Sequence, residues 1–131
     1  MIAGIQIGLA TAPATASPTP TPTPSTAYLD LSLLQSIERL SQFYRGYVHQ
    51  REALIEAVRL WRGLTGRAEA IVSLGFDPVH VADTDLDQAL LTFAQRLSSN
   101  YAGFPHQREA LLRLVQLWRQ LDSRPEVIAS L

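Results

Sequence analysis

From Leu29 onward, apolar residues recur at the spacing of amphipathic helices. The first stripe has the i, i+4, i+7, i+11 spacing of one helix face and consists of Leu33, Ile37, Leu40 and Tyr44. Asp30 or Ser32 suits the start of this helix, and Gly46 suits its stop. A broader apolar stripe covers residues 49–64, and a short third one covers residues 67–74. The pattern therefore predicts three consecutive helices.

The same pattern then occurs a second time. A shift of 57 places residues 29–74 over residues 86–131, and 25 of these 46 aligned positions are identical. Between the copies, Gly75 and Pro78 mark a linker whose Asp/Thr end suits the cap of the next helix. We therefore expect an all-α fold, built by tandem duplication of a three-helix unit and containing six helices.

A single copy is too small to bury a comfortable core, and the chain has no cysteine to staple one. The two copies should therefore pack on each other, either around an approximate internal two-fold axis or as a helical stack. A two-unit stack would leave apolar end faces exposed, which would favour a homo-oligomer or a permanent partner.

A different composition precedes the helical copies. Residues 1–27 contain no charged side chain and five of the eight prolines, four of which alternate with threonine in SPTPTPTPST. Alternating proline favours the polyproline II conformation, which acts as a semi-rigid spacer. The predicted organisation is an extended arm over 1–27, repeat 1 over 28–74, a linker over 75–85 and repeat 2 over 86–131.

The arm begins with MIAGIQIGLA, in which Ile5, Ile7 and Leu9 alternate with glycine and glutamine. This period of two is typical of a strand with one apolar face, so the peptide is a candidate for pairing with a partner's sheet edge or groove. An unstructured terminus is the simpler alternative. A signal peptide cleaved after Ala16 is a third, although no basic residue lies near Met1.

The segment HQREAL, identical in both copies, contains the most chemically suggestive side chains. His49 with Glu52, and His106 with Glu109, each lie three residues apart on one helix face and would together offer four metal ligands. Bundle metal sites have the opposite order, Glu-x-x-His, with further carboxylates projecting inward. We therefore expect helix-start and interhelix contacts from these residues, and no metal or cofactor.

Arginine and tryptophan also repeat. Trp61 and Trp118 lie within apolar helix stripes and are expected to anchor the core. Arg62 and Arg119 follow them and should face solvent or a partner, as two equivalent contact patches. The motif arginines Arg51 and Arg108 are expected to pair with Glu residues on a neighbouring helix.

The composition and motifs of the chain argue against several classes of function. Eleven basic and twelve acidic residues give a net charge of −1, which provides no field for holding nucleic acid or an anionic membrane. No apolar run approaches the ~18 residues of a membrane span. The chain also lacks a G-x-S-x-G elbow and a glycine-rich phosphate loop, so an enzyme is not expected.

The opening peptide, followed by a Thr/Pro tract and a small body, resembles short tail- and fibre-associated structural proteins of tailed bacteriophages that begin with a G-I-x-I/L-G-L peptide. The resemblance covers residues 1–10 and implies a virion protein tethered to a larger assembly. We expect a non-enzymatic adaptor that docks through Ile5, Ile7 and Leu9 and binds a second protein with its helical body. The alternatives are a secreted or envelope binding module and a tail-fibre assembly chaperone.

Overall fold

A computed structural model describes residues 23–131 of the chain. The predicted docking residues Ile5, Ile7 and Leu9, and the spacer up to residue 22, lie outside the described residues. The chain divides into two compact units, Met1–Leu31 and Ser32–Leu131, and the boundary falls within the first described helix. In the first unit the described residues are helical, and the second unit contains everything that follows.

Within the described part of the chain all regular structure is helical, and the six helices confirm the predicted fold class. The helices are α2 (Thr23–Gln42), α3 (Val48–Trp61), α4 (Arg67–Ser73), α5 (Asp83–Ser99), α6 (Pro105–Arg119) and α7 (Arg124–Ser130). A shift of 57 residues relates α2 to α5, α3 to α6 and α4 to α7. Each copy is therefore one long helix, one medium helix and one helix of two turns.

Two predicted helix starts are wrong. The first helix begins at Thr23 rather than at Asp30 or Ser32, so the end of the predicted spacer is helical. Pro24 is compatible with this start because the first helical N–H groups have no intrahelical acceptor. The Asp/Thr end of the linker is predicted to cap the second copy's long helix, but this helix already begins at Asp83. Its N-cap residue is Ala82, which offers no side-chain cap. Its acidic first turn interacts favourably with the helix dipole instead.

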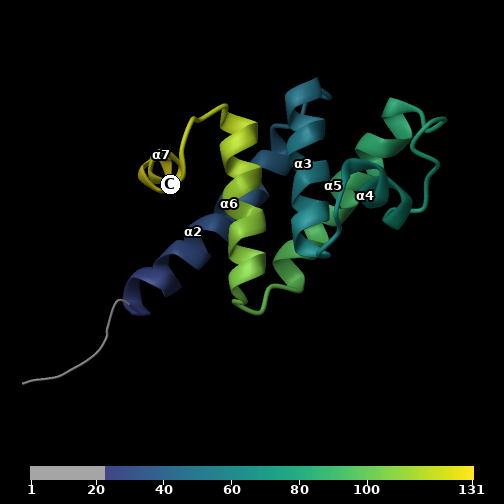
Figure 1. Ribbon diagram of the computed structural model, residues 1–131. Coiled ribbons are helices and arrows are strands. Elements are labelled where there is room, and N and C mark those ends of the chain that lie inside the picture. Colours follow the sequence, from purple (N-terminus) through teal and green to yellow (C-terminus); the bar gives the residue numbers. More distant parts are fainter. Residues whose placement is uncertain (1–22) are drawn as a thin grey trace, which may run out of the picture. The chain divides into compact units, whose positions relative to one another are not determined.

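The centre of the Ser32–Leu131 unit is the pair α3 and α6, which lie side by side and run in opposite directions (Figure 1). Their facing positions are small or branched apolar residues, which let the two helices approach closely. The fully buried ones are Ala53, Ala57 and Val58 of α3 and Ala110, Leu111, Leu114 and Val115 of α6. The duplicated medium helices thus form the core by packing on each other.

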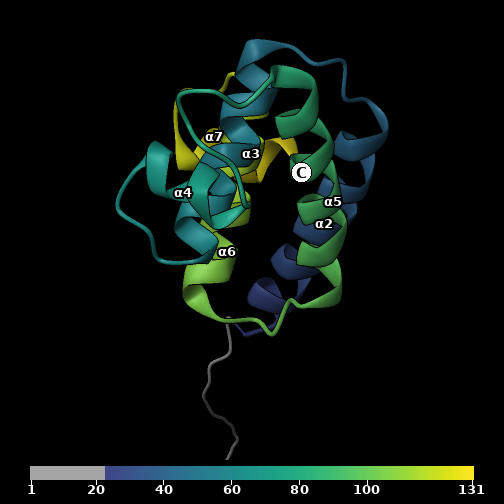
Figure 2. The same cartoon turned by 90° about the vertical axis from the view of Figure 1, so that its right-hand side faces the viewer.

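The remaining helices cover the two faces of this pair. Figure 2 shows α5 and α4 on opposite faces of the pair. The part of α2 within this unit lies next to α5, because Ile37 and Ser41 line one hollow together with Ala94 and Ser98. Since position 37 corresponds to 94 and 41 to 98, equivalent residues of the two copies meet there.

Reciprocal aromatic contacts settle how the copies are related. Tyr44 of copy one lies against Trp118 of copy two, with ring centroids 5.6 Å apart and planes inclined by 46°. Tyr101 and Trp61 form the equivalent pair at 6.1 Å and 45°. Each copy therefore contacts the other through the same two positions, as an approximate two-fold axis requires and a head-to-tail stack does not.

The predicted stop glycines lie in the turns after the long helices. Helices α2 and α5 end at Gln42 and Ser99, before Gly46 and Gly103 are reached. Both glycines have positive φ values, 77° and 80°. This left-handed conformation favours glycine and redirects the chain into α3 and α6.

Candidate functional site

The glutamine of HQREAL closes the turn that precedes α3 or α6. Gln50 is buried, and its Oε1 accepts hydrogen bonds from the backbone N–H groups of Arg45 and Tyr47, at 2.8 and 3.2 Å. Gln107 accepts the same two bonds from Ala102 and Phe104, at 2.8 and 3.2 Å. The bonds to Tyr47 and Phe104 are half of a capping box. The helix-start role predicted for His49 and His106 thus belongs to the neighbouring Gln, and its place three residues after the N-cap is the sequence signal of this role.

The arginine of the first motif joins the two copies. Arg51 donates from Nε to Asp87 Oδ1 at 2.7 Å and from Nη2 to Asp87 Oδ2 at 3.1 Å. The hydroxyl of Tyr44 also donates to Asp87. The predicted partner, a Glu on a neighbouring helix, is therefore wrong for Arg51: its main partner is an Asp on α5 of the other copy. Arg51 and Arg108 both also donate to the glycine carbonyl of the preceding turn, Gly46 or Gly103.

Burial makes this cluster electrostatically distinctive. The side chains of Arg51 and Asp87 are only 11% and 16% exposed, so solvent screens their pairing weakly. Burial alone would raise the pKa of Asp87, but the bonds from Arg51 and Tyr44 outweigh it and lower that pKa. The pKa of Tyr44 is raised, first by burial and then by its bond to Asp87. At neutral pH, Arg51 is therefore a cation, Asp87 an anion and Tyr44 a neutral phenol. This combination suits a stabilising contact between the two copies.

The glutamates of the two motifs join each medium helix to the short helix that follows. Arg67 forms a bidentate pair with Glu52, with both N···O distances at 2.8 Å. Arg124 donates to Glu109 at 3.2 Å. Both carboxylates therefore already have cationic partners. Among the described residues no group of three or more His, Cys, Asp or Glu side chains is placed to hold a metal ion.

The histidines lie beside exposed aromatic rings. His49 stacks on Tyr47, and His106 stacks on Phe104, both with centroids 5.9 Å apart. Tyr47 is 58% exposed and Phe104 is 53% exposed, although both are large apolar side chains. We call the Tyr47–His49 and Phe104–His106 pairs the aromatic turns. Because α3 and α6 run in opposite directions, the two aromatic turns lie at opposite ends of the central pair (Figure 1).

The other repeated candidates lie at the ends of α3 and α6. Trp118 is buried and Trp61 is half-buried, each in the reciprocal aromatic pair described above. Arg62 Nη1 donates to the carbonyl and hydroxyl of Ser73, at 2.7 and 2.9 Å. Arg119 makes the equivalent bonds to Ser130, both at 2.9 Å. The two arginines thus hold α4 and α7 in place, and a partner-binding role for them stays a prediction.

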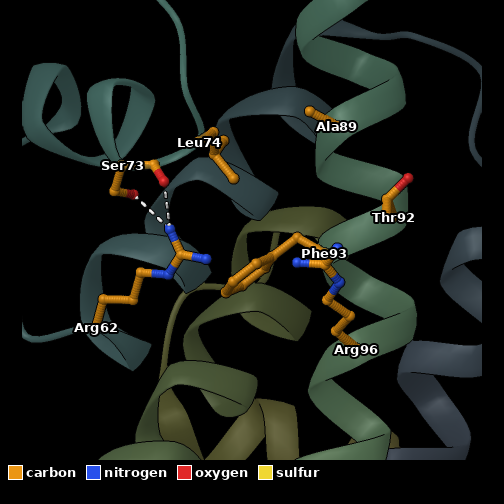
Figure 3. Close-up of a pocket in the computed structure, with 7 residues that line it drawn as sticks. All are labelled: Arg62, Ser73, Leu74, Ala89, Thr92, Phe93 and Arg96. Atoms are coloured by element: carbon orange, nitrogen blue, oxygen red, sulfur yellow. Dashed lines mark hydrogen bonds between the residues drawn. The ribbon is translucent and has the colours of Figure 1, made fainter.

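Arg62 and Arg119 each also contact a residue of the other copy, and these two contacts differ. Arg119 Nη2 donates to the hydroxyl of Ser36 at 3.2 Å. Position 36 corresponds to 93, and there Arg62 lies over the ring of Phe93, 4.7 Å from its centroid. Beside Phe93 is a pocket of about 220 Å³ that Arg62 and Arg96 line from two sides (Figure 3). The pocket is absent from the sequence-based predictions because its two arginines lie far apart in the chain.

None of the helices in the described part of the chain combines the length and the apolar character needed to cross a membrane. No protein-family model, curated protein or solved structure matches the chain. The geometry of the described residues leaves two kinds of candidate surface, the two aromatic turns and the pocket beside Phe93.

Proposed function

We propose that the chain is a non-enzymatic adaptor that joins protein components of a larger assembly. The observation that carries this proposal is the repeated aromatic turn, which presents the same kind of exposed ring at both ends of one rigid helix pair. Exposed aromatic residues of this kind are enriched at the centres of protein–protein interfaces. Two equivalent turns suit a symmetric or repeated partner.

The polar groups of the repeated motif support the same proposal. The Gln, Arg and Glu side chains of HQREAL form intramolecular contacts that shape the turn and fix the neighbouring helices. Such contacts make the aromatic turns rigid, which lowers the entropy cost of binding. The histidine and its aromatic neighbour are left facing outward.

The N-terminal peptide supplies the second contact of the proposed adaptor. Its resemblance to tail- and fibre-associated peptides of tailed bacteriophages favours a virion as the location, with residues 1–10 docking on one component. In this arrangement the helical body binds another component through the aromatic turns. Main-chain pairing and apolar burial would supply the binding energy.

The test is affinity purification of the full-length chain from its native source, followed by identification of co-purifying proteins. Deleting residues 1–12 should remove one partner, and replacing both Tyr47 and Phe104 with Ser should remove another, with circular dichroism unchanged. Val79→Ser is the matched control, because Val79 is 81% exposed and lies outside both turns. Retention of every partner by both variants would contradict the adaptor.

Mass spectrometry of the mature N-terminus distinguishes the competing secreted module. A chain that begins at Met1 or Ile2 agrees with a docking peptide. A chain that begins at Ser17 would show that the peptide is removed, and the proposed docking would then be wrong.

A further inference from the structure

The pocket beside Phe93, between α4 and α5, has an unusual electrostatic character. Its lining includes the two arginines Arg62 and Arg96 and no acidic side chain. The guanidinium of Arg96 makes no hydrogen bond or ion pair with any side chain of the described residues, whereas Arg62 is held by Ser73. Two neighbouring cations without a carboxylate favour an anionic ligand.

The geometry of Arg62 indicates how an anion would be held. Its Nη1 is occupied by Ser73 and its carbon Cζ lies 4.7 Å from the centroid of Phe93, which fixes the plane of the guanidinium. Arg96 approaches Phe93 from the other side (Figure 3). Both arginines line the pocket, so a carboxylate that enters it beside the Phe93 ring would meet N–H donors from both, and the preorganised Arg62 would lose little entropy.

The surroundings of the pocket indicate what else the ligand carries. Leu74, Ala89 and Phe93 form an apolar floor. Ser73 also lines a second hollow, whose surface is mainly apolar and is formed by Leu64, Ala68 and Val72 together with Glu69, a carboxylate that accepts hydrogen bonds from Thr65. A carboxylate with an apolar group next to it matches both features. An acidic side chain flanked by an apolar residue in a polypeptide has this composition.

We propose that this pocket binds an acidic side chain of a partner polypeptide that carries an apolar residue beside it. The inference rests on the proposed adaptor function and adds the chemistry of one contact. The chain's own arm is excluded as the occupant by charge, since residues 1–27 contain no acidic side chain. The equivalent position in the other copy has Ser36 in place of Phe93 and lacks the aromatic floor, so the site belongs to one copy only.

The test is a titration of the full-length chain with N-acetyl-Leu-Glu-Leu-amide and with its Gln analogue, followed by amide chemical shifts. Shifts at Ala89, Thr92 and Phe93 with the Glu peptide, and binding about tenfold weaker with the Gln peptide, are expected. Arg96→Gln should weaken Glu-peptide binding by a similar factor, whereas Arg39→Gln, the equivalent change in copy one, should leave it unchanged. Arg96 and Arg39 are both exposed, so both variants should fold.

Three outcomes would overturn the proposal: no shifts at these residues, equal binding of the Glu and Gln peptides, or equal loss in the two arginine variants. Stronger binding of inorganic phosphate than of the peptide would also overturn it, because the pocket would then be a phosphate site. The co-purification experiment is independent of this titration. A failed titration with partners still retained therefore rejects the pocket and leaves the adaptor standing.

Discussion

Glu56 of α3 lies beside its own counterpart in the second copy, Arg113 of α6, with 3.8 Å between Glu56 Oε2 and Arg113 Nε. Residues near a two-fold axis meet their own equivalents, so two identical copies would place like charges here. The substitution of Arg for Glu in one copy converts this repulsion into attraction. The sequence difference between the copies therefore stabilises the contact between them where equivalent positions meet, near the two-fold axis.

Arg113→Glu should restore the like-charge pair and destabilise the fold by about 0.5–1 kcal/mol, a small value because both side chains are partly exposed. Urea unfolding at low and high salt measures this loss, which should shrink as salt increases. Arg113→Gln, which removes the attraction without adding repulsion, should cost less. A loss that is independent of salt would contradict the electrostatic explanation.

Asp87→Asn should destabilise the chain by about 2–3 kcal/mol, because it leaves the buried guanidinium of Arg51 with only the exposed Asp83, 3.7 Å away, as an anionic partner. Tyr44→Phe removes one bond to the same carboxylate and should cost about 1 kcal/mol. Chemical denaturation measures both changes. Asp85→Asn is the control, since Asp85 is exposed on the same helix and should cost only a few tenths of a kcal/mol.

Acid should remove the contribution of Asp87. Its pKa in the folded chain lies below the ordinary value of 3.8, so the pairing stabilises the fold above that value and is lost as pH falls through the folded pKa. The difference in unfolding free energy between the wild type and Asp87→Asn should therefore be constant near neutral pH and should narrow below about pH 4. A difference that stays constant into strong acid would show that Asp87 does not act through its charge.

Gln50→Ala should destabilise the chain by about 1–2 kcal/mol, because two backbone N–H groups of the turn lose their acceptor. Hydrogen exchange should also accelerate at Arg45 and Tyr47, the two amides concerned. Gln88→Ala on the exposed surface of α5 is the control for a change of helix propensity. Equal effects of the two substitutions would argue against the turn-closing role.

Gln120→Gly should stabilise the chain by about 0.5–1 kcal/mol. Gln120 has a φ of 57°, a left-handed conformation that costs a side-chain-bearing residue free energy. Its counterpart in copy one is Gly63, with a φ of 67° and open space around the position of a Cβ atom. The reverse change, Gly63→Gln, should destabilise by a similar amount in thermal unfolding. Stabilisation by both changes, or by neither, would contradict the conformational explanation.

Local patterns predicted the helices well and their partners less well. The apolar spacing of Leu33, Ile37 and Leu40 is sufficient to identify a helix face, and the shift of 57 residues identifies the duplication. The pairing of Arg51 with Asp87 depends on which helices become neighbours, which periodicity does not contain. It is recoverable only once the two-fold arrangement of the copies is known.

The same limit applies to the candidate surfaces. The HQREAL side chains have the chemistry of a binding site, yet Gln50, Arg51 and Glu52 all form contacts that maintain the fold. The pocket beside Phe93 combines Arg62, just after α3, with residues at the end of α4 and on α5, and has no local motif. Its aromatic floor does leave one trace in the sequence, the replacement of Ser36 by Phe93 between otherwise similar copies.

The reciprocal contacts of Tyr44 with Trp118 and of Tyr101 with Trp61 mean that neither copy completes its own aromatic core. A chain cut between α4 and α5 would consequently yield two fragments that reassociate without a covalent link. Two intact chains could satisfy the same contacts by exchanging copies, which gives a domain-swapped dimer at high concentration. The conformation of the segment between α4 and α5 therefore decides whether the two copies that pack together belong to one chain or to two.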